Sequence, residues 1–152
     1  MRISHAIKGV AKLETKFKNF EKDCKAGQIH AVQDSIFLID KTAKELIQDN
    51  GDGTAQIRYS SSGAKRVVAV SNPGDPPNTD TGRLVQSIKF DFQDGGLTGR
   101  VGTNLKYGAW LEFGTKNMKA RPWLSTAVSM TAKQVADIFF KRIQEVIKGA
   151  GK

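Results

Sequence analysis

Apolar residues recur with helical spacing through the first third of the chain, and this pattern constrains the fold most. They recur every three or four residues, first at Ile7, Val10, Leu13, Phe17, Phe20 and Cys24, and then at Ile29, Val32, Ile36, Ile39, Ala43 and Leu46. Such spacing places them along one face of an α-helix. Gly27 costs about 1 kcal/mol relative to alanine inside a helix. The pattern therefore predicts one long helix or two, ended by turn residues at 49–53.

Two pairs of short segments that follow have the patterns of β-hairpins. Residues 55–59 alternate with period two, residues 60–63 supply a loop, and residues 65–70 are rich in β-branched side chains. A second pair comprises residues 88–92 and 97–102, which flank a turn containing two glycines. The sequence therefore predicts two consecutive antiparallel hairpins.

Shorter patterns place the remaining helices. Asp80 and Thr81 could cap a short helix that runs to Ser87, and residues 105–113 predict another short helix, closed by Gly114. Residues 122–147 begin with proline and repeat apolar residues at helical spacing.

This order of elements predicts an α+β fold, in which a small, mostly antiparallel sheet of two hairpins packs against long N-terminal and C-terminal helices. We expect the 152 residues to form a single domain, 1–152. Three prolines remove backbone amide donors at residues 72–80, so this segment should be a prolyl loop or arm.

Charge and composition narrow the class of protein. The net charge is +9 at pH 7, and residues 101–152 carry nine Lys or Arg against three Asp or Glu. This excess is compatible with a nearby polyanion, either nucleic acid or an acidic protein surface. Cys24 is the only cysteine, so no intramolecular disulfide can form. Because the sequence has no long apolar run, we expect neither a secretory signal nor a membrane span.

Residues suited to catalysis are scarce. His5 and His30 lie 25 residues apart without a cysteine cluster, and the chain has no nucleophile elbow, dinucleotide-binding motif or P-loop. Glu112 could have a raised pKa if buried. We favour an ion-pair or capping role for it, with Arg121 or Arg83 as plausible partners. We therefore expect no catalytic residue, cofactor or metal ion.

Nucleic-acid recognition has weak support in the C-terminal helix. Lys133, Lys141 and Lys148 share one helical face, but Asp137 lies four residues from each of the first two. A Lys-Asp-Lys ladder of this kind favours a solvated polar face over a DNA-reading helix. Nonspecific approach to a phosphate backbone stays open.

Recognition-type side chains are concentrated in residues 100–124, RVGTNLKYGAWLEFGTKNMKARPWL, which contain both tryptophans. Trp, Tyr and Arg dominate the energetically important positions of protein interfaces. Either tryptophan could instead belong to the core.

Four motifs occur in order within the second half of the chain. They are PPNTDTGRL at residues 76–84 with Ser87 and Ile88, VGTN at 101–104 with Tyr107, EFGT at 112–115, and Met118 with ARPWL at 120–124. In this order and spacing they resemble the small tail-component family of long-tailed bacteriophages and prophages, whose members are described as neck, head-tail joining or tail completion proteins. The resemblance covers residues 70–130, and the flanking helices match by pattern. Two positions depart from the family pattern. Trp123 stands where phenylalanine is more usual, and Gly108 follows Tyr107 at the start of the predicted short helix.

The resemblance implies a structural virion protein without enzymatic activity, located in the head-tail neck and assembled in the host cytoplasm. The expected assembly is a ring, of six copies, between the capsid connector and the tail. Expected partners are further copies of the chain, the head-tail connector or stopper protein, and the tail tube or tail terminator protein. Genomic DNA is a further candidate if it passes through the lumen, and no membrane partner is expected.

Three alternatives remain from the sequence. The protein could be a tail terminator that caps the tail tube, or a cytosolic protein that binds nucleic acid nonspecifically. An enzyme ranks third, with Glu112 as a buried acid.

We expect two different interface patches, because neighbours in a ring meet through different patches. The prolyl segment, residues 72–80, is one of them, and residues 112–123 either form the other or hold the base of the prolyl arm. Arg83 and Arg121 are the candidates for charge-assisted hydrogen bonds. The residues predicted to lie at subunit or partner interfaces are Pro76, Pro77, Asp80, Arg83, Tyr107, Trp110, Glu112, Phe113, Arg121 and Trp123.

Overall fold

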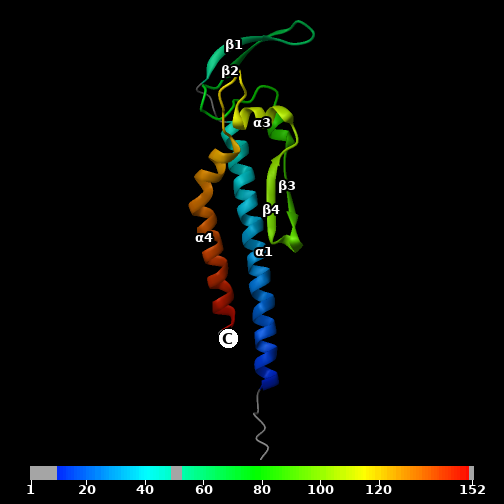
Figure 1. Ribbon diagram of the computed structural model, residues 1–152, viewed down its shortest axis with the longest axis vertical. Helices are drawn as coiled ribbons and strands as arrows, with labels where there is room; N and C mark the ends of the chain where they lie inside the picture. Colours follow the sequence, from blue (N-terminus) through cyan, green and yellow to red (C-terminus); the bar gives the residue numbers. More distant parts are fainter. Residues whose placement is uncertain (1–9, 49–52, 151–152) are drawn as a thin grey trace, which may run out of the picture.

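Two long helices and two β-hairpins make up the computed structural model, which describes residues 10–48 and 53–150 (Figure 1). The elements in chain order are α1 (Val10–Gln48), β1 (Thr54–Tyr59), β2 (Lys65–Val70), α2 (Arg83–Ser87), β3 (Ile88–Gln93), the 3-10 turn η1 (Asp94–Gly96), β4 (Thr98–Thr103), α3 (Lys106–Phe113) and α4 (Leu124–Ala150). The α+β class and both hairpins are confirmed. The predicted turn at residues 49–53 and the helix start at Ile7 lie largely outside the described residues.

A single helix forms the first element, and Gly27 does not divide it. A Cβ atom at Gly27 would lie only 2.9 Å from Cγ2 of Val146 on α4. The glycine therefore permits close approach of the two long helices, a contact that outweighs its poor helix propensity.

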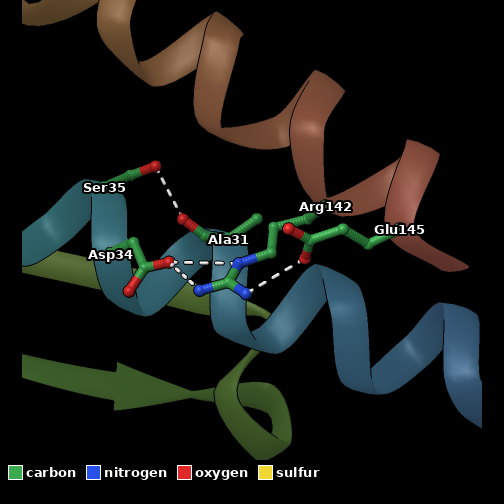
Figure 2. Close-up of polar contacts among 5 residues, drawn as sticks. All are labelled: Ala31, Asp34, Ser35, Arg142 and Glu145. Atoms are coloured by element: carbon green, nitrogen blue, oxygen red, sulfur yellow. Dashed lines mark hydrogen bonds and ion pairs between the residues drawn. The ribbon is translucent and has the colours of Figure 1, made fainter.

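The long helices lie side by side and run in opposite directions (Figure 1). Arg142 of α4 joins them, because its Nη2 lies 2.6 Å from Oδ2 of Asp34 on α1. Glu145 holds the same guanidinium at 3.2 Å, as Figure 2 shows. Hydrogen bonds and ion pairs with Asp34, and then Glu145, raise the pKa of Arg142. The contact thus links the two helices near the end of α4.

The hairpins form two separate two-stranded sheets, whereas the sequence pattern suggested one small sheet. Strands β1 and β2 pair from Thr54↔Val70 to Tyr59↔Lys65, at one end of the molecule. Strands β3 and β4 lie along α1, where the rings of Phe37 and Phe90 meet edge to face at 5.2 Å. The prolyl segment and α2 lie between the two hairpins in the chain, and the strands of each hairpin pair only with each other.

Most of the buried core lies where the second half of α1 meets α2, α3 and the start of α4. Its buried members are Ala43, Ile47, Leu84, Ile88, Trp123 and Ala127. By contrast, every residue from Val10 to Asp23 is exposed. The two halves of α1 therefore stand in different environments.

Candidate functional site

A pocket of about 310 Å³ opens between β2, the prolyl segment, α2 and α3. Five of the ten predicted interface residues line it, namely Pro77, Asp80, Arg83, Tyr107 and Arg121. Apolar side chains such as Ile47 and Leu84 form part of its wall and belong to the core. Residues 77–80 of the prolyl segment thus line a concave surface.

Asp80 ties the first hairpin to the prolyl segment. Its Oδ2 accepts a hydrogen bond from Nη1 of Arg58 at 2.8 Å, and its Oδ1 pairs with Arg66. Arg58 and Arg66 are directly opposed across β1 and β2. Like charges that face each other across a hairpin repel. The shared carboxylate of Asp80 therefore offsets the repulsion between the two guanidinium groups.

The predicted capping of α2 by Asp80 and Thr81 is wrong. Helix α2 begins at Arg83, and its N-cap is Gly82 in the left-handed region at φ 72°, with no side-chain cap. The carboxylate of Asp80 is directed instead to the two guanidinium groups of the hairpin.

Buried polar atoms with no hydrogen-bond partner lie in the wall of the pocket. Both Nδ2 and Oδ1 of Asn78 are in this state, and so is Nε of Arg121. Arg121 satisfies one of its other groups, since Nη1 donates to Oγ of Ser71 at 2.8 Å. A buried polar group left unsatisfied costs about 1–3 kcal/mol. These atoms are enclosed by the surrounding protein and have almost no accessible surface.

Glu112 caps a helix to which it does not belong. It projects from α3, and its Oε2 accepts hydrogen bonds from the backbone N–H groups of Trp123 and Leu124, both at 2.9 Å. Its Oε1 accepts from the N–H of Ser125 at 2.9 Å. Three amides that have no partner inside α4 are satisfied, and the carboxylate sits at the positive end of the helix dipole.

The capping interpretation of Glu112 is confirmed, but the raised pKa is wrong. Burial by itself raises the pKa, whereas hydrogen bonds from the Ser125 side chain and from the three backbone amides lower it and prevail. Neither Arg83 nor Arg121 forms an ion pair with Glu112 among the described residues. The group is an anionic cap rather than a buried acid.

The two tryptophans have different environments. Trp123 is 2% exposed, and its Nε1 donates to the backbone oxygen of Gly108 at 3.2 Å. A Cβ at Gly108 would lie 2.5 Å from Cγ2 of Thr103, so the glycine serves packing rather than flexibility. Trp110 and Phe113, by contrast, are 54% and 82% exposed on α3. Pro76 is half-buried.

The structure therefore divides nine of the ten predicted interface residues among three places. Pro77, Asp80, Arg83, Tyr107 and Arg121 meet at the pocket, whereas Glu112 and Trp123 join α3 to α4. Trp110 and Phe113 remain on the surface. Sequence reasoning missed Arg58, Arg66 and Asn78. The equal charges of Arg58 and Arg66 on facing strands could have signalled a shared carboxylate.

Lysines of α4 do not form the predicted ladder. Asp137 makes no ion pair with Lys133 or Lys141, and Lys148 has none with any residue that the structure describes. All three lysines are exposed. Their charges are thus available to a partner.

Residues 10–48 and 53–150 contain no group of three or more His, Cys, Asp or Glu side chains placed to hold a metal ion. Within the same residues, no helix is long and apolar enough to cross a membrane.

Comparison with known proteins relates the chain to a protein family. A family model described as "Bacteriophage HK97-gp10, putative tail-component" matches residues 11–114, about two thirds of the chain. The match takes in nearly all of α1, both hairpins and α3, and it ends before α4. No curated protein and no solved structure is significantly similar to the chain.

Proposed function

Because the chain belongs to the HK97-gp10-like family of bacteriophage tail components, we propose that it is a structural virion protein of the head-tail neck. In this proposal it is a tail completion protein, and copies of the chain form a ring, of six subunits, that joins the capsid connector to the tail. Membership of the family supports a role as a phage tail component. The assignment to the head-tail neck rests on the surfaces described above.

The pocket is the observation that carries the proposal. Its wall combines apolar side chains, such as Ile47 and Leu84, with polar ones, such as Asn78 and Arg121. Arg83 is exposed at its edge and forms no ion pair with a described residue. Such a site suits a peptide segment of a neighbouring protein better than a small apolar ligand. In a ring, each subunit would offer one patch and receive a different one.

Trp110 and Phe113 supply the second contact surface in this proposal. Exposed aromatic side chains of this size are frequent centres of protein interfaces. The cap that Glu112 forms on α4 fixes the end of α3 against the core, so the two aromatic rings project from a rigid base. Glu112 and Trp123 would then position the interface rather than touch the partner.

Electron microscopy of phage particles that carry a labelled copy of the protein tests the proposal. We expect density for a ring between the filled head and the tail. The double variant Trp110→Ala, Phe113→Ala should give filled heads and separate tails, whereas Lys116→Ala, a nearby exposed control, should give joined particles. Joined, infectious particles from the aromatic double variant would contradict this assignment of the interface.

A tail terminator is the nearest alternative, since it also binds the end of the tail tube as a ring. The two roles differ in the order of assembly. A terminator is found on tails purified from a mutant that makes no heads, whereas a completion protein that joins first to the head is found on filled heads from a tail-less mutant.

A further inference from the structure

The N-terminal half of α1 carries an apolar stripe that nothing in the described chain covers. Val10, Leu13, Phe17 and Phe20 follow one another at intervals of three, four and three residues, and each is between 36% and 63% exposed. Cys24, Gly27 and Ala31 continue the same spacing farther along the helix. We call the first four residues the α1 stripe. Its spacing is that of a helix that packs against another helix.

Helix α4 covers only the continuation of this stripe. It contacts α1 at Gly27 through Val146 and at Asp34 through Arg142 (Figure 2). It then ends at Ala150, while α1 extends past that end (Figure 1). The α1 stripe therefore extends an existing helix-helix contact beyond the end of the partner helix.

A matching stripe lies on α4 itself. Phe140, Ile143 and Ile147 are spaced by three and four residues and are 51–64% exposed. At 3.6 residues per turn, this α4 stripe is rotated by roughly 100° from Val146 and Arg142, which face α1. The two stripes of one chain therefore face different directions and do not cover each other.

Charges beside the stripes are complementary. Glu14 and Glu21 directly follow Leu13 and Phe20, while Lys141 and Lys148 directly follow Phe140 and Ile147. These four side chains form no ion pair with any residue in the described part of the chain. Both pairs are separated by seven residues, which is two helical turns.

Each charged side chain directly follows an apolar residue of its stripe, so on both right-handed helices the charged row lies to the same rotational side of the stripe. When two such helices pack stripe against stripe, their charged rows lie on the same side of the contact only if the helices run antiparallel. In that orientation Leu13 lies opposite Ile147, Phe17 opposite Ile143 and Phe20 opposite Phe140. The glutamates then face the lysines, and α1 and α4 of one chain already pack in the same sense.

We propose that the α1 stripe of one copy packs antiparallel against the α4 stripe of a neighbouring copy. This inference rests on the proposed ring, and it names the helices that close it. Two antiparallel α1 helices would place Glu14 and Glu21 of both copies together, which is unfavourable. Pairing of α1 with α4 covers both exposed stripes in one contact. Because the two surfaces differ, a single contact leaves one stripe free on each copy, so the contact can repeat from copy to copy around the proposed ring.

Disulfide cross-linking of the full-length chain tests the pairing. In a Cys24→Ser background, one copy carries Phe17→Cys and another Ile143→Cys, and the purified proteins are mixed and oxidised. We expect a cross-linked dimer from the mixture and none from either protein alone. A control in which Lys18→Cys replaces Phe17→Cys should give no product, since Lys18 lies on another face of α1. Circular dichroism verifies that each variant is folded.

Charge reversal gives a second readout. Glu14→Lys with Glu21→Lys should abolish the cross-link, and Lys141→Glu with Lys148→Glu in the partner copy should restore it. Cross-linking of Phe17→Cys with itself would overturn the proposal in favour of paired α1 helices, and no product from any mixture would overturn it in favour of another protein partner. If the protein lies at the neck by microscopy but no cross-link forms, the proposed function stands and this inference fails. If the cross-link forms but microscopy shows that the protein is absent from the neck, the helix pairing stands and the proposed function fails.

Discussion

The two halves of α1 have the same helical pattern but different surroundings. From Ala31 to Ile47 the helix contributes buried residues that pack against α4, the second hairpin and the core around Trp123. From Val10 to Asp23 every residue is exposed, including two phenylalanines. Apolar periodicity therefore shows that a helix face will be covered, but it does not tell whether the cover comes from the same chain. Variants in the two halves should separate folding from assembly.

The largest loss of stability is expected at the core. Trp123→Ala removes a fully buried indole and its hydrogen bond to Gly108, and should reduce the free energy of unfolding by about 3–5 kcal/mol. Urea titration followed by circular dichroism measures this loss. An unfolding free energy within 1 kcal/mol of the wild type would show that Trp123 is not part of the core.

The cap between α3 and α4 should give a smaller, pH-dependent effect. Glu112→Gln weakens the bonds to the amides of α4 and should cost about 0.5–2 kcal/mol at pH 7. Because the folded-state pKa of Glu112 is lowered, its contribution is present above the unfolded-state pKa and is lost as the pH falls through the folded-state pKa. Thermal unfolding across the acidic range should show that the difference between variant and wild type shrinks. A constant difference would contradict the anionic cap.

Asp80→Asn should act locally on the first hairpin. The neutral amide leaves Arg58 and Arg66 facing each other without a counter-charge, and the global cost should stay below about 1 kcal/mol because these pairs are partly exposed. Hydrogen exchange should be faster at the amides of β1 and β2 than in the wild type. Lys65→Asn, at the end of β2, is the control. Equal exchange in the two variants would argue against the role of Asp80.

The smallest effect on folding is expected in the α1 stripe. Phe17→Ser removes an exposed ring and should change the free energy of unfolding of the isolated chain by less than about 0.5 kcal/mol. The same substitution should reduce self-association, measured by sedimentation velocity. A large loss of stability in the monomer would show that the stripe is covered within one chain and that the contrast between the two halves of α1 is wrong.

Local features of the fold were predictable, and distant contacts were not. Periodicity and turn residues identify the long helices and both hairpins because these elements depend on neighbours in sequence. The pairing of Arg58 with Asp80 joins residues 22 positions apart and depends on where the prolyl segment lies. The same holds for the separation into two sheets and for the packing of Gly27 against Val146.

The candidate site was predictable to a similar extent. Five predicted residues line one pocket. Pro77, Asp80 and Arg83 are close in sequence, whereas the fold brings Tyr107 and Arg121 to them. Glu112 was identified as a cap, yet its three amide partners could not be named before the position of α3 beside the start of α4 was known. Exposed Trp110 and buried Trp123 could not be distinguished from composition, since composition does not show which of the two faces the core.

Electron microscopy of the assembled head-tail neck, at a resolution that separates helices, would show whether α1 and α4 of neighbouring copies pair. We expect a ring of copies in which the N-terminal half of each α1 lies antiparallel to α4 of the adjacent copy, with Phe17 near Ile143. A neck that lacks this protein, or a ring in which the α1 stripe faces solvent, would contradict this expectation.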